Sequence, residues 1–332
     1  MLKRFIFILS GAFMLNACMK DVEEDKAYSI TSIPEEILLE TIPMTESYSR
    51  QFYYDLSENR IVHENDKQEW DLAFDNTDEG QTIWLNTANF MEAGLSENSF
   101  EEVTSSTGIS MSFDDPSGSA DSTAIGAWWK QESIVYVINR GIDENGSPMG
   151  YKKVVFSMLT QGVYKIRFAN LDGSEEYTVE VAKNAMEGRI MWSFENGGEV
   201  AFTEPEEWDL WFTQYTKTLF AEGEPYPYLV VGALTKRPAM ATAQLSRSFE
   251  EVSLADADTA SWFPYADAVG YDWKELTGDV ESGDVSYVIP DSNIYLLRDQ
   301  VNEEYYKLRF TGFYDETGRK GYPAFEYMHL LR

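Results

Sequence analysis

One five-residue pattern, Trp-Asp-Leu-x-Phe, occurs twice in this chain, at residues 70–74 and 208–212. A polar run precedes each copy, and each copy places large apolar side chains close together without the longer period of a helix. This combination predicts a short buried strand that follows an exposed loop. The second copy begins 138 residues after the first, which indicates two related halves.

Four further pairs of segments recur in the same order and at similar separations. A shared order over five pairs is typical of an internal duplication. We therefore expect two homologous domains, at residues 47–185 and 186–332, that meet near residue 185. The additional pairs are 99–103 with 248–252, 124–129 with 268–273, 135–138 with 285–289, and 164–168 with 306–310.

Within both halves the residue pattern is that of β-strands. Residues 164–168 and 306–310 alternate aromatic or aliphatic side chains with Lys and Arg, which predicts strands with one buried face and one face in water. Turn residues such as Asp172-Gly173 separate the strands, and Pro323 favours an edge position for the last strand. We therefore predict an all-β protein, with two homologous antiparallel domains of the β-sandwich or barrel-like kind.

The first 17 residues have the features of a lipoprotein signal peptide. Basic Lys3 and Arg4 precede an apolar run over residues 5–15, which is too short to span a bilayer, and Ala17 stands before Cys18. We expect cleavage before Cys18 and attachment of a lipid to its thiol, which would anchor the mature protein to a membrane. Because Cys18 is the only cysteine, no internal disulfide is expected.

Residues 18–46 are expected to form a linker between the lipid and the folded domains, with one short helix at residues 34–39. Folded structure is expected to begin near Tyr48. The acidic stretch at residues 19–25 resembles the signal that exports Bacteroidetes lipoproteins to the cell surface. The alternative is an ordinary solvated tether.

The charge of the chain excludes one class of partner. Its 57 acidic and 26 basic residues give a net charge of −31, which repels the phosphates of nucleic acid and the anionic faces of membranes. We therefore expect no nucleic-acid partner and membrane attachment only through the N-terminal lipid. Such acidity is typical of a soluble surface, and a role in binding cations is the alternative.

The residue content argues against catalysis. The chain has only two histidines, His63 and His329, so a catalytic triad based on His is not expected. His63 is interpreted as a solvated loop residue and His329 as a residue at the edge of the core. Acidic segments at residues 114–121 and 143–146 lack the spacing of a calcium-binding loop and are interpreted as turns. The sequence has no phosphate-binding loop, Cys/His metal cluster or nucleophile motif, and we expect a binding protein and not an enzyme.

The second half resembles the HmuY family of Bacteroidetes surface lipoproteins. The resemblance is carried by residues 207–212, 305–310 and 321–327, together with the lipoprotein start. It implies an all-β haem-binding protein, or haemophore, on the cell surface of the outer membrane. Such a protein takes haem from host proteins and delivers it to a TonB-dependent outer-membrane receptor. In family members a pair of His or Met side chains holds the haem iron.

The resemblance implies axial ligands but does not identify a histidine pair in this chain. The loop after the second Trp-Asp strand has no His, but it contains Met240, our first candidate, because a thioether is a soft ligand of haem iron. Met149 is a second candidate and His329 a third. Two alternatives stay open: a surface binding or scaffold protein that has lost haem ligation, and a surface hydrolase that uses acidic residues.

Overall fold

The computed structural model describes residues 36–131, 133–160, 162–184, 186–279 and 284–331. The predicted signal peptide, Cys18 and the predicted export signal lie outside these residues. Within the described ranges, no helix is long and apolar enough to cross a membrane.

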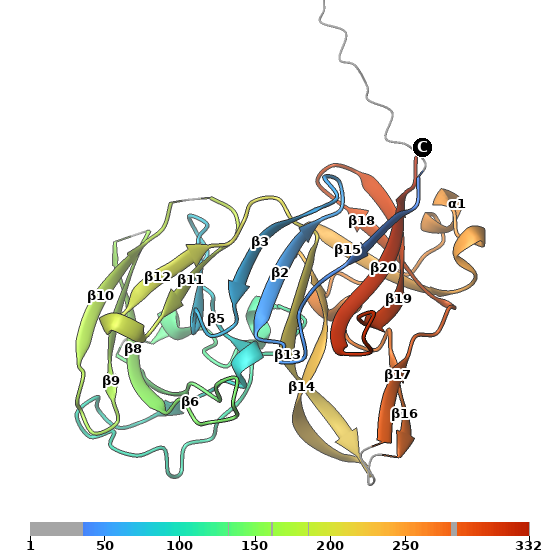
Figure 1. Cartoon of the computed structure of the whole chain (residues 1–332). Coiled ribbons are helices and arrows are strands. Elements are labelled where there is room, and N and C mark those ends of the chain that lie inside the picture. Colours follow the sequence, from blue (N-terminus) through green and yellow to red (C-terminus); the bar gives the residue numbers. More distant parts are fainter. Residues whose placement is uncertain (1–35, 132, 161, 185, 280–283, 332) are drawn as a thin grey trace, which may run out of the picture. The chain divides into compact units, whose positions relative to one another are not determined.

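The described structure consists almost entirely of β-strands, so the all-β prediction is confirmed (Figure 1). The strands are β1 (Leu38–Thr41), β2 (Arg50–Asp55), β3 (Arg60–Asp66), β4 (Leu72–Asp75), β5 (Ile83–Leu85), β6 (Glu92–Ser96), β7 (Val135–Asn139), β8 (Tyr151–Thr160), β9 (Val163–Asn170), β10 (Tyr177–Ala182), β11 (Arg189–Ser193), β12 (Glu199–Thr203), β13 (Leu210–Ala221), β14 (Glu224–Thr235), β15 (Met240–Ser246), β16 (Glu275–Asp279), β17 (Asp284–Val288), β18 (Asn293–Asp299), β19 (Glu304–Tyr314) and β20 (Lys320–His329). The helices are α1 (Leu254–Ala257) and the 3-10 turns η1 (Thr87–Asn89), η2 (Ala120–Ser122), η3 (Trp128–Lys130), η4 (Glu195–Gly197), η5 (Phe249–Glu251) and η6 (Ala266–Ala268).

Most of the strands form four antiparallel sheets. Two sheets have five strands, in the orders β10-β9-β8-β7-β6 and β1-β20-β19-β18-β15. Two have four strands, in the orders β12-β11-β4-β5 and β14-β13-β2-β3. Strands β16 and β17 form a separate hairpin.

Each five-stranded sheet shares an apolar core with one four-stranded sheet. Phe156 of β8, Phe74 of β4 and Trp192 of β11 belong to one core, and Phe310 of β19 and Phe212 of β13 belong to another. We call strands β4–β12 the first lobe, and strands β1–β3 with β13–β20 the second lobe. Each lobe therefore has its own core between two sheets, as alternating strands require.

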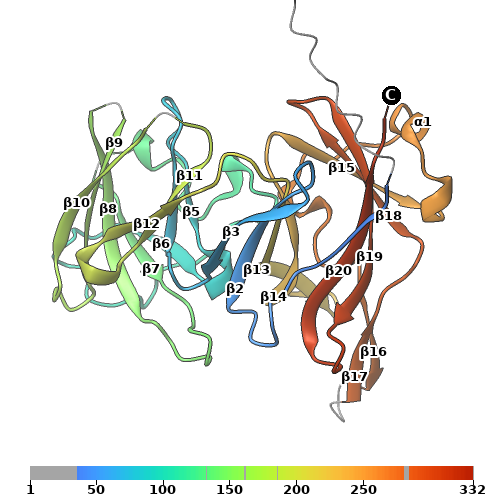
Figure 2. The same cartoon turned by 45° about the horizontal axis from the view of Figure 1, so that its top comes forward.

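The lobes do not coincide with the domains expected from the sequence. β2 pairs with β13, with Tyr54 opposite Leu210, and Figure 2 shows β2 and β3 beside β13 and β14. β11 pairs with β4, with Trp192 opposite Leu72. The expected boundary at residue 185 is therefore wrong, because hydrogen-bonded strand pairs cross it in both directions.

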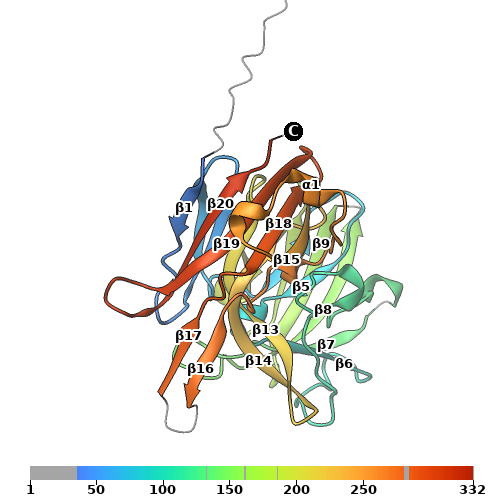
Figure 3. The same ribbon diagram turned by 90° about the vertical axis from the view of Figure 1, so that its right-hand side faces the viewer.

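Part of the expected linker is a strand of the second lobe. β1 lies along β20, with Leu38 opposite Tyr327 (Figure 3). Ile42 and Met44 are fully buried in the second-lobe core. The linker and its short helix are therefore wrong for the described residues from 36 onward. A four-residue strand has too few alternations to be recognised by its period.

β1 also changes the position of the last strand. Because β20 pairs with β19 on one side and with β1 on the other, β20 is an interior strand. The edge position expected from Pro323 is therefore wrong. The pairing of β19 with β20 is irregular between Phe310 and Tyr314, and Pro323 itself is not among the regular partners there. Such an irregular stretch accommodates a residue without an N–H.

The two repeated Trp residues are buried, as predicted. Trp70 and Trp208 lie in one apolar cluster with residues of both lobes. The regular strands begin two residues later, at Leu72 and Leu210. The aspartate that follows each Trp therefore lies where the chain joins its strand, and the first of these aspartates is part of the site described next.

Candidate functional site

A cavity of about 350 Å³ lies in the first lobe, between the β8–β10 strands and the end of β11. Its lining combines two cations, several aromatic rings and a thioether. The lining residues are Arg140, Met149, Gly150, Tyr151, Lys152, Asn170, Glu175, Tyr177, Phe194, Glu195, Asn196 and Gly197.

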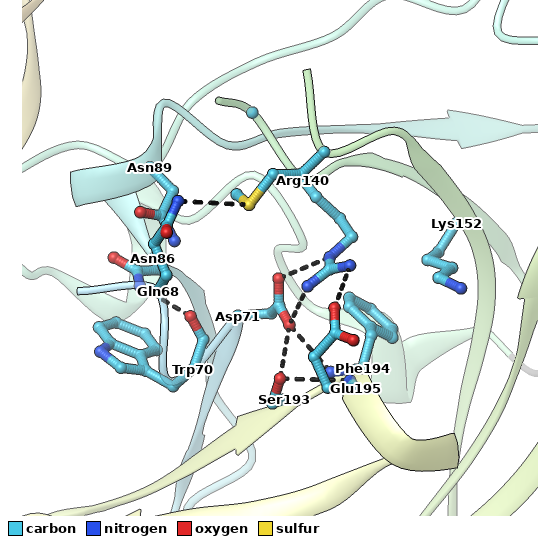
Figure 4. Close-up of polar contacts among 12 residues, drawn as sticks. Gln68, Trp70, Asp71, Asn86, Asn89, Arg140, Lys152, Ser193, Phe194 and Glu195 are labelled. Carbon is cyan, nitrogen blue, oxygen red and sulfur yellow. Dashed lines mark hydrogen bonds and ion pairs between the residues drawn. The ribbon is translucent and has the colours of Figure 1, made fainter. Parts of the chain in front are cut away.

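Asp71, from the first Trp-Asp pattern, holds a cation at the wall of the cavity. Its buried carboxylate accepts hydrogen bonds from Arg140, from Nε at 2.8 Å and from Nη2 at 3.1 Å (Figure 4). Burial opposes the charge of Arg140, but the attraction of Asp71 outweighs it and the pKa of Arg140 is raised. This two-point pair fixes the guanidinium in one orientation.

The same carboxylate fixes the end of β11. Asp71 Oδ2 accepts from Ser193 Oγ at 3.1 Å and from the Phe194 backbone N–H at 2.9 Å. Glu195 follows in η4, where its Oε1 lies 2.7 Å from Arg140 Nη1. Three segments that are far apart in the sequence therefore meet at Arg140.

A glycine sets the direction of the chain after Arg140. Gly141 has a φ of +78°, and a Cβ at this position would overlap the backbone carbonyl of Asn89. Only glycine fits both the backbone angle and the close approach. The position of Arg140 is therefore fixed by the backbone as well as by Asp71.

Lys152 of β8 is the second cation of the cavity. Its Nζ donates to Asn170 Oδ1 at 2.8 Å and lies 3.2 Å from Glu175 Oε2. The Lys152 side chain is 10% exposed and that of Glu175 is 60% exposed. Hydrogen bonds from Lys152 and Asn170 lower the pKa of Glu175, so this carboxylate is charged at neutral pH.

Sulfur and aromatic groups complete the lining. The sulfur of Met149 accepts a weak hydrogen bond from Gln68 Nε2 at 3.8 Å. Tyr151 and Tyr177 are partly exposed, and the Phe194 ring centre lies 5.8 Å from the guanidinium carbon of Arg140. Flat rings beside cations suit a ligand that is planar and anionic.

The other two proposed haem ligands do not line this cavity. Met240 is the first residue of β15 and is 1% exposed, in the second-lobe core. His329 ends β20, and its ring centre lies 4.9 Å from that of Tyr306. Of the three proposed ligands, the structure therefore brings only Met149 to the cavity.

His63 is not the loop residue that the sequence suggested. It lies in β3, opposite Tyr53, with its ring centre 4.5 Å from that of Phe202. Burial lowers the pKa of His63, so its neutral form is favoured. The expectation was wrong because the polar residues that follow His63 conceal the alternation of β3.

The acidic segments are turns, as expected. Asp143 accepts from the backbone N–H groups of Asn145 and Ser147. Asp114 accepts from the backbone N–H groups of Leu85 and Ala124, and burial raises its pKa to about 7. In the part of the chain that the structure describes, no group of three or more His, Cys, Asp or Glu residues could hold a metal ion.

Sequence reasoning did not identify the charged residues of the cavity. Arg140 follows an apolar strand and Lys152 lies near the start of another, positions that are equally typical of solvated cations. Asp71 was visible as part of the repeated pattern, but a pattern does not show which cation its carboxylate contacts. That contact joins residues far apart in the sequence and depends on the tertiary fold.

The sequence and the fold were compared with known proteins. The HmuY protein family model matches residues 47–327. No curated protein matches the sequence.

Solved structures of related proteins give weak superpositions. Apo PinO from Porphyromonas gingivitis is 9% identical, with 90% of this chain and 99% of that chain covered and a TM-score of 0.31. The apo HmuY analog TFO from Tannerella forsythia is 11% identical, with coverages of 90% and 98% and a TM-score of 0.25. A candidate HmuY-like haem-binding protein from Bacteroides vulgatus is 14% identical, with coverages of 55% and 93% and a TM-score of 0.21. The family model spans most of the described residues, and the chain therefore belongs to the HmuY family, which consists of binding proteins rather than enzymes.

Proposed function

We propose that this protein binds haem or a related tetrapyrrole in the cavity of the first lobe. The observation that carries the proposal is the position of Met149, which brings a soft sulfur ligand to a cavity lined by aromatic rings and cations. Bound haem would supply an iron that can accept this sulfur. Tyr177 and Phe194 are placed to contact an apolar ring, and Arg140 and Lys152 to meet carboxylates.

The size of the cavity limits how such a ligand would be held. At about 350 Å³ it is near the lower end of the range of roughly 300–1,000 Å³ that is typical of small-molecule sites. It fits the carboxylate-bearing edge of a tetrapyrrole better than the whole molecule. A ligand that stays partly accessible suits a protein that passes its ligand to a receptor.

Titration of haemin into the purified mature chain tests this function through the Soret band. In Met149→Leu the Soret shift should be lost, or the affinity should fall at least about tenfold, because leucine fills the same space without a sulfur donor. Met186→Leu is the matched control, since Met186 is 40% exposed and does not line the cavity. No Soret shift in either redox state, or an unchanged shift in Met149→Leu, would contradict the proposal.

A second candidate function is binding of a non-haem ligand in the same cavity. No histidine is among the described lining residues, and Met149 is their only thioether, so an iron would find a single His or Met ligand there. Iron-free protoporphyrin distinguishes the two functions. If it binds as tightly as haemin to the wild-type chain, iron ligation does not contribute to affinity and the second function is favoured.

We propose that the lipoprotein start anchors the mature protein at the cell surface of the outer membrane. There it would take haem from host proteins and pass it to a TonB-dependent receptor. The position of Cys18 after an apolar run supports the anchor. Cys18→Ser should move the protein from the membrane fraction to the soluble fraction, and its retention in the membrane fraction would contradict the anchor.

We also propose that the two lobes arose by duplication. Tyr54 faces Leu210 in the β2–β13 pair, and Trp192 faces Leu72 in the β11–β4 pair. The β2–β3 and β11–β12 hairpins both have a register shift immediately before these residues. Equivalent residues are 138 positions apart throughout, as they are in the repeated Trp-Asp pattern. Shared register irregularities at one constant separation support a common origin.

Two of the segment pairs inferred from the sequence are not equivalent. Residues 135–138 lie in β7 of a five-stranded sheet, whereas residues 285–289 overlap β17 of the separate hairpin. Residues 164–168 lie in β9, the second strand of its sheet, whereas residues 306–310 lie in β19, the third strand. These pairings are wrong because the same alternation recurs in strands at different positions.

Two buried lysines support β8 and β19 as the equivalent strands. Lys153 Nζ of β8 donates to the Val103 carbonyl, and Lys307 Nζ of β19 donates to the Val252 carbonyl. Each ammonium also faces the ring of the Phe in the repeated Ser-Phe-Glu-Glu-Val segment. Lys307 was expected to face water, but it is buried because these carbonyls and the ring replace its hydration.

A further inference from the structure

We propose that the first-lobe cavity takes a ligand with two carboxylates, which replace those of Glu195 and Glu175 on Arg140 and Lys152. This inference rests on the proposed binding site and names the chemistry of its ligand. In the free protein the two glutamates would then occupy the positions of the ligand's acid groups.

The two cations keep their positions without the glutamates. Arg140 and Lys152 each have a side chain that is 10% exposed. Each has an inner partner that does not belong to the exposed pair: Asp71 for Arg140, and Asn170 for Lys152. Loss of an outer carboxylate would therefore leave each cation held and ready to bind another anion.

The two glutamates are the exposed members of their pairs. The side chain of Glu195 is 61% exposed and that of Glu175 is 60% exposed. Ion pairs with a solvated partner contribute little to stability. A ligand carboxylate can therefore take the place of either glutamate at low cost, because the new ion pair restores the charge balance of a nearly buried cation.

The lining between the cations defines the body of the ligand. Phe194, Tyr177 and Met149 are among the residues that line the cavity. The rings of Phe194 and Tyr177 suit a flat unsaturated body that can stack on them. A planar molecule with two acidic arms matches both parts of the lining.

The second lobe lacks this arrangement. With Lys153 and Lys307 taken as equivalent, Lys152 corresponds to Tyr306. Its cross-strand partner Asn170 corresponds to His329, which faces Tyr306 across the β19–β20 pair. A Tyr and a His thus stand where the first lobe has a Lys and an Asn. The dicarboxylate site is therefore assigned to the first lobe alone.

The test compares iron-free protoporphyrin, which has two free carboxylates, with its dimethyl ester, in a porphyrin fluorescence titration of the full mature chain. The diacid should bind at least about tenfold more tightly than the ester. Glu195→Gln and Glu175→Gln should each increase the affinity for the diacid about fivefold, because they remove a competing carboxylate. Lys152→Gln should decrease it about tenfold.

Glu176→Gln is the matched control for Glu175→Gln. Glu176 pairs with Arg167 and does not line the cavity, so this variant should bind the diacid as the wild type does. Equal affinities for diacid and ester would overturn the inference. Unchanged or weaker diacid binding in both Glu195→Gln and Glu175→Gln would also overturn it. Thermal unfolding checks that these variants are folded.

These outcomes are separate from the test of haem ligation. Porphyrin without iron has no metal that the Met149 sulfur could bind. Met149→Leu should therefore change haemin binding and leave the preference for diacid over ester unchanged. If haemin gives no Soret shift but the diacid preference and the glutamate effects are seen, only the ligation of iron fails. If the Soret shift is seen but the diacid preference and the glutamate effects are not, only the dicarboxylate inference fails.

Discussion

At the scale of single residues, the two Trp-Asp aspartates do the same structural task with different electrostatics. Asp71 accepts from the Phe194 backbone N–H, and Asp209 accepts from the Leu56 backbone N–H at 2.7 Å. Asp71 is also paired with Arg140. Burial raises the pKa of Asp209 to about 7. The repeated residue is therefore paired with a cation in the first lobe, whereas in the second lobe it is an aspartate whose pKa is raised by burial.

This contrast predicts unequal effects of the same substitution. Asp71→Asn should lower the free energy of unfolding by about 3–5 kcal/mol, because it leaves the buried charge of Arg140 without its closest counter-ion. Asp209→Asn should cost less than about 1 kcal/mol, since an amide oxygen can still accept from Leu56. Urea denaturation at pH 7 measures both values. Equal losses of unfolding free energy in the two variants would show that the ion pair with Arg140 does not make Asp71 more important for stability than Asp209.

Two buried aspartates, Asp114 and Asp209, predict how stability depends on pH. Burial raises the pKa of both Asp114 and Asp209 to about 7, above the value of about 4 expected in the unfolded chain. Between these values the folded protein binds protons that the unfolded chain has released, so stability should fall as pH rises from about 4 to about 7. Urea midpoints should therefore be higher at pH 5 than at pH 8.

The double variant Asp114→Asn/Asp209→Asn is the control for this pH effect. It removes both raised pKa values, and its urea midpoint should change less between pH 5 and pH 8 than that of the wild type. If the two proteins show the same pH dependence, other groups cause it, and the carboxyl groups of Asp114 and Asp209 do not.

At the scale of elements, the first three strands determine whether the second lobe is complete. β1 adds an outer strand to β20, and β2 adds its strand to β13. The segment between β1 and β2 buries Ile42 and Met44 in the second-lobe core. Strands β1 and β2, near the start of the chain, are therefore part of a core whose other strands come from the second half of the chain.

Truncation separates this arrangement from the linker expected from the sequence. A chain that begins at residue 47 should be less stable than one that begins at residue 36, by at least about 2–5 kcal/mol. That range is the usual cost of deleting one large buried apolar side chain, and Ile42 and Met44 are both lost. Thermal unfolding of the two chains measures the difference. Equal melting temperatures would mean that residues 36–46 are a tether after all.

At the scale of the whole described chain, the two lobes are connected by contacts as well as by sequence. Thr216 Oγ1 of β13 donates to the Thr87 carbonyl at 2.8 Å. The guanidinium carbon of Arg189 in β11 lies 5.3 Å from the ring centre of Trp211 in β13. A shared apolar cluster contains Trp70 and Trp208. The Trp residues of the repeated pattern therefore lie where the lobes contact each other.

Cleavage of the loop between β10 and β11 tests the assignment of strands to lobes. A protease site inserted there gives one piece that carries β1–β10 and another that carries β11–β20. The pieces should elute together from a sizing column, because β2 pairs with β13 and β11 pairs with β4. Separation of the pieces without denaturant would show that each half pairs its own strands, as the domain boundary near residue 185 predicted.

Local pattern was enough for part of this picture. Alternation in segments such as 164–168 predicted strands, and the two copies of the Trp-Asp-Leu-x-Phe pattern, at residues 70–74 and 208–212, were predicted to be buried strands. Both properties depend on neighbouring residues, whose side chains alternate between the two faces of a strand. The cavity could be predicted only as far as Met149, which was one of three candidates and was not the first.

The sequence by itself determined an all-β fold, buried Trp residues in a pattern that occurs twice, and membership of a family. The tertiary structure alone decided that β2 pairs with β13 and β11 with β4, and that Arg140 meets Asp71 and Glu195 beside Lys152. Strand formation follows from the alternation of apolar and polar side chains with a period of two, which neighbouring residues determine. The choice of partner depends on which of several similar strands can close a core, and that choice involves residues more than a hundred positions apart.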